Sequence, residues 1–188
     1  MEYIIEQVAQ RIKFTREILE LSYEEMAEVT GVSVDEYIAC ENGKSDFSFT
    51  FLFKCAEKFG IDLAELLTGE VPKLSFYSIV RKGKGLSVKR RNGLEYSHLA
   101  YLFKHKIAEP FLVTAKYSTA EQDAEIALST HEGQEMDYIL KGQMKVRFES
   151  HTEILKEGDC VYYDSSHGHG MIATGGEDCT FLAIVMKA

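Results

Sequence analysis

The sequence has no tryptophan, only 2 prolines among 188 residues, and no long run of apolar residues. Because a membrane-spanning helix needs about 20 consecutive apolar residues, no membrane segment is expected. The opening stretch, MEYIIEQVAQRIK, contains acids and lacks the apolar centre of a secretion signal, which predicts a cytoplasmic protein. The 4 cysteines are widely spaced with no CxxC pair, so free thiols are expected.

The net charge of −9 is confined to the N-terminal part of the chain. Residues 1–70 contain 6 Lys or Arg and 15 Asp or Glu, whereas residues 71–188 contain 15 of each. Nucleic-acid binding draws much of its affinity from cations that contact phosphates. The acidic first part of the chain therefore weighs against DNA binding.

Helical periodicity and capping signals in the first part of the chain predict five helices, of which the first is long and amphipathic. Ser22 and Ser33 each stand three residues before a glutamate, which predicts two capping boxes. Gly31 lies between them and favours a turn, so the pair forms a helix-turn-helix unit. The alternating run 47–51 is interpreted as the entry of a fourth helix, because apolar spacing continues to Phe59.

After a polar segment at residues 68–75, the apolar period changes to two. Residues 111–115, 144–148 and 181–186 read as strands, and glycines separate them. This pattern predicts an all-β barrel or sandwich. The predicted domains are a helical domain at 1–69, a linker with leading strands at 70–106, and a barrel at 107–188.

The helical part resembles the XRE-type, lambda-repressor-like DNA-binding domain. The match rests on Glu25-Met26-Ala27, Gly31-Val32-Ser33, Glu41-Asn42-Gly43-Lys44 and Phe59-Gly60-Ile61. The resemblance implies a five-helix bundle whose third helix enters the major groove. The DNA contacts that it implies are Arg16, Tyr23, Ser33, Val34, Tyr37 and Lys44. A bundle that binds protein, or nothing, is the alternative, because Asp35 and Glu36 stand on the recognition helix.

Basic residues gather just before the barrel. The cluster consists of Arg81, Lys82, Lys84, Lys89, Arg90 and Arg91. It is interpreted either as a set of additional phosphate contacts or as a solvated hairpin.

The second part of the chain resembles the cupin family through two motifs. The first is STHEGQEMDYILKG from Ser129, and the second is Gly158-Asp159 followed by DSSHGHGM from Asp164. By this resemblance the metal ligands fall on His131, Glu135 and His169, while Ser129 stands where cupins usually have a first His. Two imidazoles and one carboxylate suit Fe(II), and Zn(II), Mn(II) or Ni(II) also fit. The alternative is a metal-free barrel whose polar residues bind an organic ligand or water.

Strand alternation adds further candidates inside the barrel. If Glu135 points inward, so does Asp137, and a buried carboxylate needs either a ligand or an internal cation as its partner. The candidate ligand-binding residues are therefore Ser129, Asp137 and Tyr101. His167 competes as a metal ligand, and the residues Tyr96, His98 and Tyr162 either line the cavity or simply pack.

A helix-turn-helix domain joined to a cupin resembles bacterial regulators in which the barrel senses a small molecule and alters DNA affinity. Such a regulator is expected to be a homodimer or higher homo-oligomer, because two half-sites need two domains. The alternative is an enzyme, since the same domain order with a His/Glu/His triad resembles iron-dependent epoxidases of fosfomycin biosynthesis. In these a Lys of the helical domain contacts the phosphonate, and the aligned residue here is Glu20, which argues against the same substrate.

Overall fold

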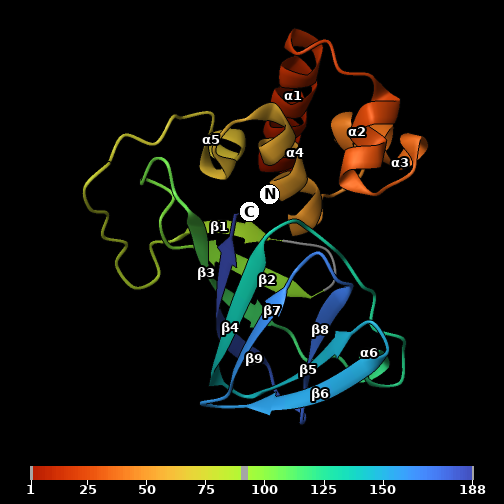
Figure 1. Cartoon of the computed structure of the whole chain (residues 1–188), viewed down its shortest axis with the longest axis vertical. Coiled ribbons are helices and arrows are strands. Elements are labelled where there is room, and N and C mark those ends of the chain that lie inside the picture. The colour runs from red at the N-terminus through yellow and green to blue at the C-terminus, as the bar shows by residue number, and fades with distance from the viewer. Residues whose placement is uncertain (1, 90–92, 188) are drawn as a thin grey trace. The chain divides into compact units, whose positions relative to one another are not determined.

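The computed structural model describes residues 2–89 and 93–187 and divides them into two units (Figure 1). One unit runs to Ser78 and includes Tyr101–His105, and the other contains Ile79–Ala100 and the chain from Lys106 onward. These units differ from the predicted domain boundaries. The reason is local pairing: Leu74 N–H donates to the Leu102 carbonyl at 3.0 Å, and Lys104 N–H donates to the Leu74 carbonyl at 2.8 Å.

The helical unit contains the five helices that the sequence predicts. They are α1 (Glu2–Ile18), α2 (Tyr23–Thr30), α3 (Val34–Glu41), α4 (Phe49–Phe59) and α5 (Leu63–Thr68). The predicted capping box at the start of α2 is present with both of its hydrogen bonds. At the start of α3, the Ser33 hydroxyl accepts from Glu36 N–H at 3.2 Å, which is one of the two predicted bonds. Gly31 ends α2 with a φ of 74°, a conformation that glycine adopts without strain.

Apolar side chains from every helix of this unit meet in one core. The helix at residues 49–59 buries most of its side chains, so the alternating run before it is a helix entry, as predicted. The largest fully buried side chains of the unit are Ile12, Met26, Tyr37, Phe47, Leu52, Phe53 and Leu66. No helix in the described part of the chain combines the length and apolar character that crossing a membrane requires.

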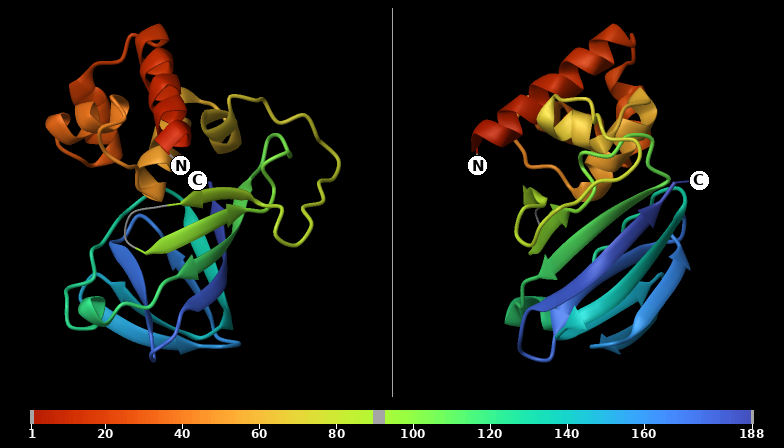
Figure 2. Two further views of the ribbon diagram at one scale, coloured as in Figure 1. Left: turned by 180° about the vertical axis from the view of Figure 1, so that it is seen from behind. Right: turned by 90° about the vertical axis from the view of Figure 1, so that its left-hand side faces the viewer.

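The second unit is built from two antiparallel sheets (Figure 2). Its elements are β1 (Leu86–Lys89), β2 (Leu94–His98), β3 (Ala108–Ala115), α6 (Thr119–Gln122), β4 (Gln134–Lys141), β5 (Gln143–Phe148), β6 (His151–Lys156), β7 (Cys160–Asp164), β8 (His169–Thr174) and β9 (Cys179–Met186). Within the described residues, the large sheet has the order β1-β2-β3-β9-β4-β7 and the small sheet the order β6-β5-β8.

The inner face of the large sheet has a polar row and an apolar row. Glu135 pairs in register with Val185 on one side and with Tyr163 on the other, and Val185 pairs with Glu109. Two rows further along, the inner face carries the buried apolar residues Val113, Phe181 and Ile139. The apolar row forms the barrel core, and the polar row contains Glu135, a residue of the candidate functional site.

Candidate functional site

Three side chains from the two sheets and the loop before β4 converge inside the barrel. His131 lies in the loop before β4, Glu135 on β4 and His169 at the start of β8. One donor atom from each lies within 4.8 Å of the other two, and all three side chains are buried. Among the described residues, this is the cluster of His, Cys, Asp and Glu side chains with the geometry to hold a metal ion. The sequence therefore selected residues that do come together.

The orientation of the two imidazoles suits metal binding. His131 Nδ1 lies 3.2 Å from the Glu132 carbonyl, and His169 Nδ1 lies 2.9 Å from the His167 carbonyl. A carbonyl oxygen only accepts, so in the neutral imidazole each Nδ1 carries the proton and each Nε2 presents a lone pair. Metal-binding histidines are commonly fixed in this way by a backbone carbonyl.

The Nε2 lone pair of His131 faces a carboxylate. Its distance to Glu135 Oε2 is 3.1 Å, although neither atom carries a hydrogen when Nδ1 holds the proton. Two acceptors at this distance repel unless a proton or a metal cation lies between them. A divalent cation satisfies both acceptors at once, so the donor set fits a metal ion.

Asp137 occupies the next inward position on β4, as strand alternation predicts. Its side chain is fully buried, and within the described residues its Oδ1 has no hydrogen-bond partner. The hydroxyl of Tyr163 donates weakly to Oδ2 across 3.4 Å. Burial, followed by the neighbouring Glu135 carboxylate, raises the pKa of Asp137 well above its usual range.

Tyr163 is a residue of the site that the sequence analysis missed. Its ring lies 5.0 Å from the His169 ring, centroid to centroid, and it pairs in register with Glu135. Tyr162, which the sequence analysis considered for the cavity, instead points outward with 56% of its surface exposed. Once Glu135 is placed inside, antiparallel register with β7 would have identified Tyr163.

Burial lowers the pKa of His169, which favours its neutral form.

Of the other predicted site residues, one lies beside the His/Glu/His cluster and two lie away from it. Ser129 pairs with His169 through two backbone hydrogen bonds, with N–H to carbonyl distances of 2.8 and 3.0 Å, so it lies directly beside a candidate metal ligand. His167 is exposed and pairs with Glu149 at 2.9 Å, so its ring does not belong to the cluster. Tyr101 was predicted to line the barrel, but it belongs to the helical unit.

A second buried histidine–carboxylate pair lies near the other edge of the large sheet. His98 Nε2 lies 2.7 Å from Glu109 Oε2, and both side chains are fully buried. Here Ala100 N–H donates to Nδ1 at 3.0 Å, so Nε2 carries the proton and donates to Glu109. Lys106 and Lys187 add cations at 3.7 and 3.5 Å from the two carboxylate oxygens. Glu109 Oε2 thus accepts a hydrogen bond from His98, and two cations lie near the carboxylate, while its Oε1 has no hydrogen-bond partner among the described residues.

In the helical unit, the start of α3, which the sequence predicts to be the recognition helix, is open to solvent. Ser33 and Lys44 are exposed and Val34 is half-buried, so these predicted DNA-binding residues lie at the surface. Asp35 and Glu36 are exposed beside them. Of the basic cluster, the side chains of residues 81, 82 and 84 are exposed, whereas Arg90 and Arg91 and the side chain of Lys89 lie outside the described residues.

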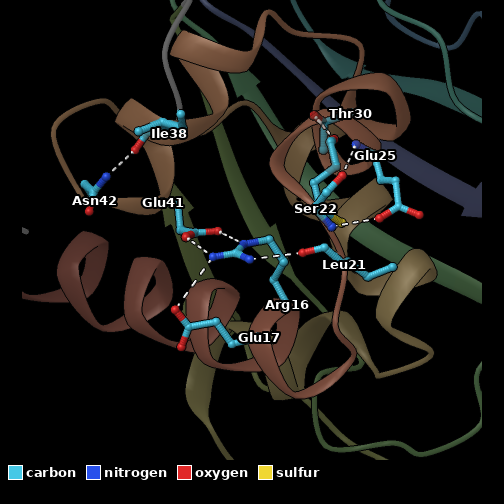
Figure 3. A network of polar contacts seen from close by, with 10 residues as sticks. Arg16, Glu17, Leu21, Ser22, Glu25, Thr30, Ile38, Glu41 and Asn42 are labelled. Carbon is cyan, nitrogen blue, oxygen red and sulfur yellow. Dashed lines mark hydrogen bonds and ion pairs between the residues drawn. The ribbon is translucent and has the colours of Figure 1, made fainter.

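Two predicted DNA contacts are contradicted by burial. Tyr37 is fully buried, and Arg16 is 8% exposed. Figure 3 shows why: Arg16 Nε and Nη2 donate to the two oxygens of Glu41 at 2.7 and 2.9 Å, and Nη1 donates to the Leu21 carbonyl at 3.0 Å. The guanidinium also lies 4.3 Å from the ring centroid of half-buried Tyr23. Arg16 therefore joins α1 to α3 instead of contacting phosphate.

Comparisons with known proteins agree with this two-part organisation. The model of a helix-turn-helix domain matches residues 9–71, and the model of the cupin domain matches residues 117–185. No curated protein matches the chain in sequence. The chain is similar in structure to an HTH_3 family transcriptional regulator from Vibrio cholerae, with 23% identity, a TM-score of 0.69, and coverage of 100% of this chain and 98% of that one.

The chain is also similar in fold to an epoxidase. Hydroxypropylphosphonic acid epoxidase from S. wedmorenis, in complex with fosfomycin, shows 19% identity, a TM-score of 0.51, and coverage of 97% of this chain and 99% of that one. The FeII form of HppE shows 20% identity and a TM-score of 0.50, with coverage of 97% and 100%. At these identities the likeness concerns the fold.

Proposed function

The chain joins an N-terminal helix-turn-helix domain to a C-terminal cupin domain, and we propose that it is a DNA-binding transcriptional regulator whose barrel holds a divalent metal and senses a small molecule. One observation carries the proposal: a solvent-exposed start of α3 and a buried His/Glu/His cluster occur on the same chain. The first suits a DNA groove, and the second suits a metal with open coordination positions.

DNA binding in this proposal begins at the N-terminus of α3. Ser33 and Val34 face the base edges, Lys44 contacts phosphate, and Tyr23 lies at the start of α2 near the backbone. Asp35 and Glu36 repel phosphate, so binding needs the cations of two subunits, and the phosphate contacts of these cations make binding dependent on salt. A homodimer also supplies the two recognition helices that a two-fold operator requires.

In this proposal the small molecule binds at the metal site. His131, Glu135 and His169 would hold Fe(II), Zn(II), Mn(II) or Ni(II), and the ion would supply a Lewis acid with positions open to an oxygen or nitrogen ligand. Ser129 and Asp137 lie close to these residues in sequence and contact the incoming molecule. The small molecule changes DNA affinity only if it binds the two conformations of the regulator differently.

The test measures DNA binding and metal content on the same untagged protein. We expect a stoichiometric divalent metal, and fluorescence anisotropy against a duplex library that selects a palindrome with a steep salt slope. Lys44→Gln should reduce the slope of log K against log salt by about 1, whereas Lys58→Gln, an exposed lysine at the end of α4, should leave it unchanged. If the protein binds no duplex even at low salt, the proposal that it is a DNA-binding regulator is refuted.

An oxygen-using metalloenzyme is the second candidate, and the composition of the site favours it. Two histidines and one carboxylate, with Ser129 in place of a fourth ligand, leave positions open for both O₂ and a substrate. Glu20 is exposed in the turn after α1 and would repel a phosphonate. Stoichiometric iron with O₂ consumption, together with no salt-dependent DNA binding, would select the enzyme.

A further inference from the structure

The two outer faces of the barrel differ in chemistry. On the small sheet the outward side chains include Lys145 and Arg147, and the chain's own segment around α6 covers them. Lys145 Nζ donates to the Gln122 carbonyl at 3.2 Å, and Arg147 Nη1 donates to Glu125 at 2.6 Å and to the Ile126 carbonyl at 3.2 Å. This outer face is charged, and it already has a cover.

The outer face of the large sheet is apolar over four neighbouring strands. Its outward residues are Ala108, Pro110, Leu112 and Thr114 on β3, Thr180, Leu182, Ile184 and Met186 on β9, Gln134, Met136, Tyr138 and Leu140 on β4, and Cys160, Tyr162 and Asp164 on β7. The exposed fractions of Leu112, Tyr138 and Leu140 are 37%, 40% and 44%. We name these fifteen positions the outer apolar face.

The centre of the outer apolar face carries no charged residue. Asp164 lies at one edge, where it accepts hydrogen bonds from Ser166, and the exposed Lys141 pairs in register with Thr180 at one end of the face. A partner of different chemistry, such as a nucleic acid or a charged peptide, is normally recognised by charges placed to meet it, and this face offers none in its centre. Residues 71–188, which include the barrel, contain equal numbers of acids and bases, so two barrels can meet through this neutral patch without net electrostatic repulsion.

The size of the face also fits a second copy. Four strands about 4.8 Å apart, with four outward positions about 6.7 Å apart along each strand, cover roughly 500 Å² of sheet. Burying such a face on two subunits removes about 1,000 Å² from water, the lower bound for a specific interface. Two sheets stacked face to face pack about 10 Å apart, and the self-complementary patch suits a two-fold axis.

We propose that a second copy of this chain packs on the outer apolar face, sheet against sheet, about a two-fold axis. The proposal deepens the dimer on which the proposed function rests. It places the subunit contact on the back of β4, the strand whose inner side carries Glu135. A change inside the barrel and a change between subunits thus act on the two sides of one strand.

The experiment measures the mass of the full-length protein by sedimentation velocity, without DNA or added metal. The wild type should have twice the chain mass of 21.3 kDa at micromolar concentration. Tyr138→Lys and, independently, Leu112→Lys should raise the dimer dissociation constant at least tenfold while the far-ultraviolet circular dichroism stays unchanged. The matched control is Ile154→Lys, since Ile154 is 53% exposed and points outward on the small sheet, and this variant should stay dimeric.

A second measurement tests directly whether the outer apolar face is covered, through the alkylation rate of a cysteine on it. Cys160 is the exposed cysteine of the chain, while Cys40, Cys55 and Cys179 are buried, and it lies next to Tyr138 in register. Alkylation of Cys160 should be slow in the wild type and fast in Tyr138→Lys. A monomeric wild type, or two folded face variants that keep the wild-type mass, overturns the proposal. A dimer that binds no duplex leaves this inference standing and refutes the regulator instead.

Discussion

The barrel contains two buried histidine–glutamate pairs that consist of the same residue types and differ in chemistry. At His98 a backbone N–H meets Nδ1, so Nε2 holds the proton and donates to Glu109. At His131 a backbone carbonyl meets Nδ1, so in the neutral imidazole Nε2 holds a lone pair that faces Glu135. The backbone group beside Nδ1 thus decides between two kinds of pair. A complete pair has a hydrogen bond between the histidine and the carboxylate, whereas an incomplete pair has two acceptors that need a cation between them.

The largest effect should come from breaking the complete pair. Glu109→Ala removes the carboxylate that His98, Lys106 and Lys187 contact, and removing one partner of a buried charged cluster costs about 3–5 kcal/mol. Urea unfolding followed by circular dichroism should show this loss in the barrel transition. Glu95→Ala, an exposed acid on the neighbouring strand β2, is the control. A loss below 1 kcal/mol would mean that the Glu109 cluster does not hold the barrel together.

The incomplete pair should show itself through metal binding. A divalent metal at about 100 times its dissociation constant should stabilise the barrel by about 2.7 kcal/mol, and a chelator should reverse the effect. Glu135→Gln should abolish most of this stabilisation, because the amide is a poor metal ligand. Glu149→Gln, which alters the exposed pair with His167, should retain it. Equal metal stabilisation of the two variants would place the metal elsewhere.

Without metal, the same substitution should have the opposite sign. In Glu135→Gln the amide N–H₂ donates to the Nε2 lone pair of His131, which replaces a contact between two acceptors by a hydrogen bond worth about 1 kcal/mol. The metal-free variant should therefore melt at a higher temperature than the metal-free wild type. A lower melting temperature would show that a proton already bridges the wild-type pair.

The smallest effect concerns a complete pair at the surface. Ser22 N–H donates to Glu25 at 2.7 Å, and this bond holds the pKa of Glu25 below its usual value (Figure 3). The stabilisation is complete above the ordinary glutamate pKa and is lost as the pH falls through the lower, folded value. Glu25→Gln keeps an acceptor oxygen and should lose this acid dependence. Melting curves of the helical unit between neutral and acidic pH test it, and parallel curves for both proteins would contradict it.

Sequence patterns located the elements well because they record local physics. The capping signal at Ser22 and the switch from a 3.6-residue to a two-residue period both fix structure within a few neighbours. The two cupin motifs also identified three residues that meet in space, since His131, Glu135 and His169 occupy positions set by the fold.

Partner choice across the fold was not visible in the sequence. Arg16 looks like a phosphate contact until Glu41, distant in sequence, is found to bind it. Tyr162 and Tyr163 differ only in the side of β7 on which they lie, and a shift of one residue in register exchanges them. Long-range pairing of this kind decides which side chains face the interior.

The path of the chain has a practical consequence. The polypeptide passes from one unit to the other three times, after Ser78, after Ala100 and after His105. A single protease cut within the exposed residues 81–84 therefore leaves residues 101–105, which form two backbone hydrogen bonds with Leu74, on the fragment that contains the barrel. The unit that contains the helices therefore includes a piece of chain that lies, in sequence, between strands β2 and β3 of the barrel.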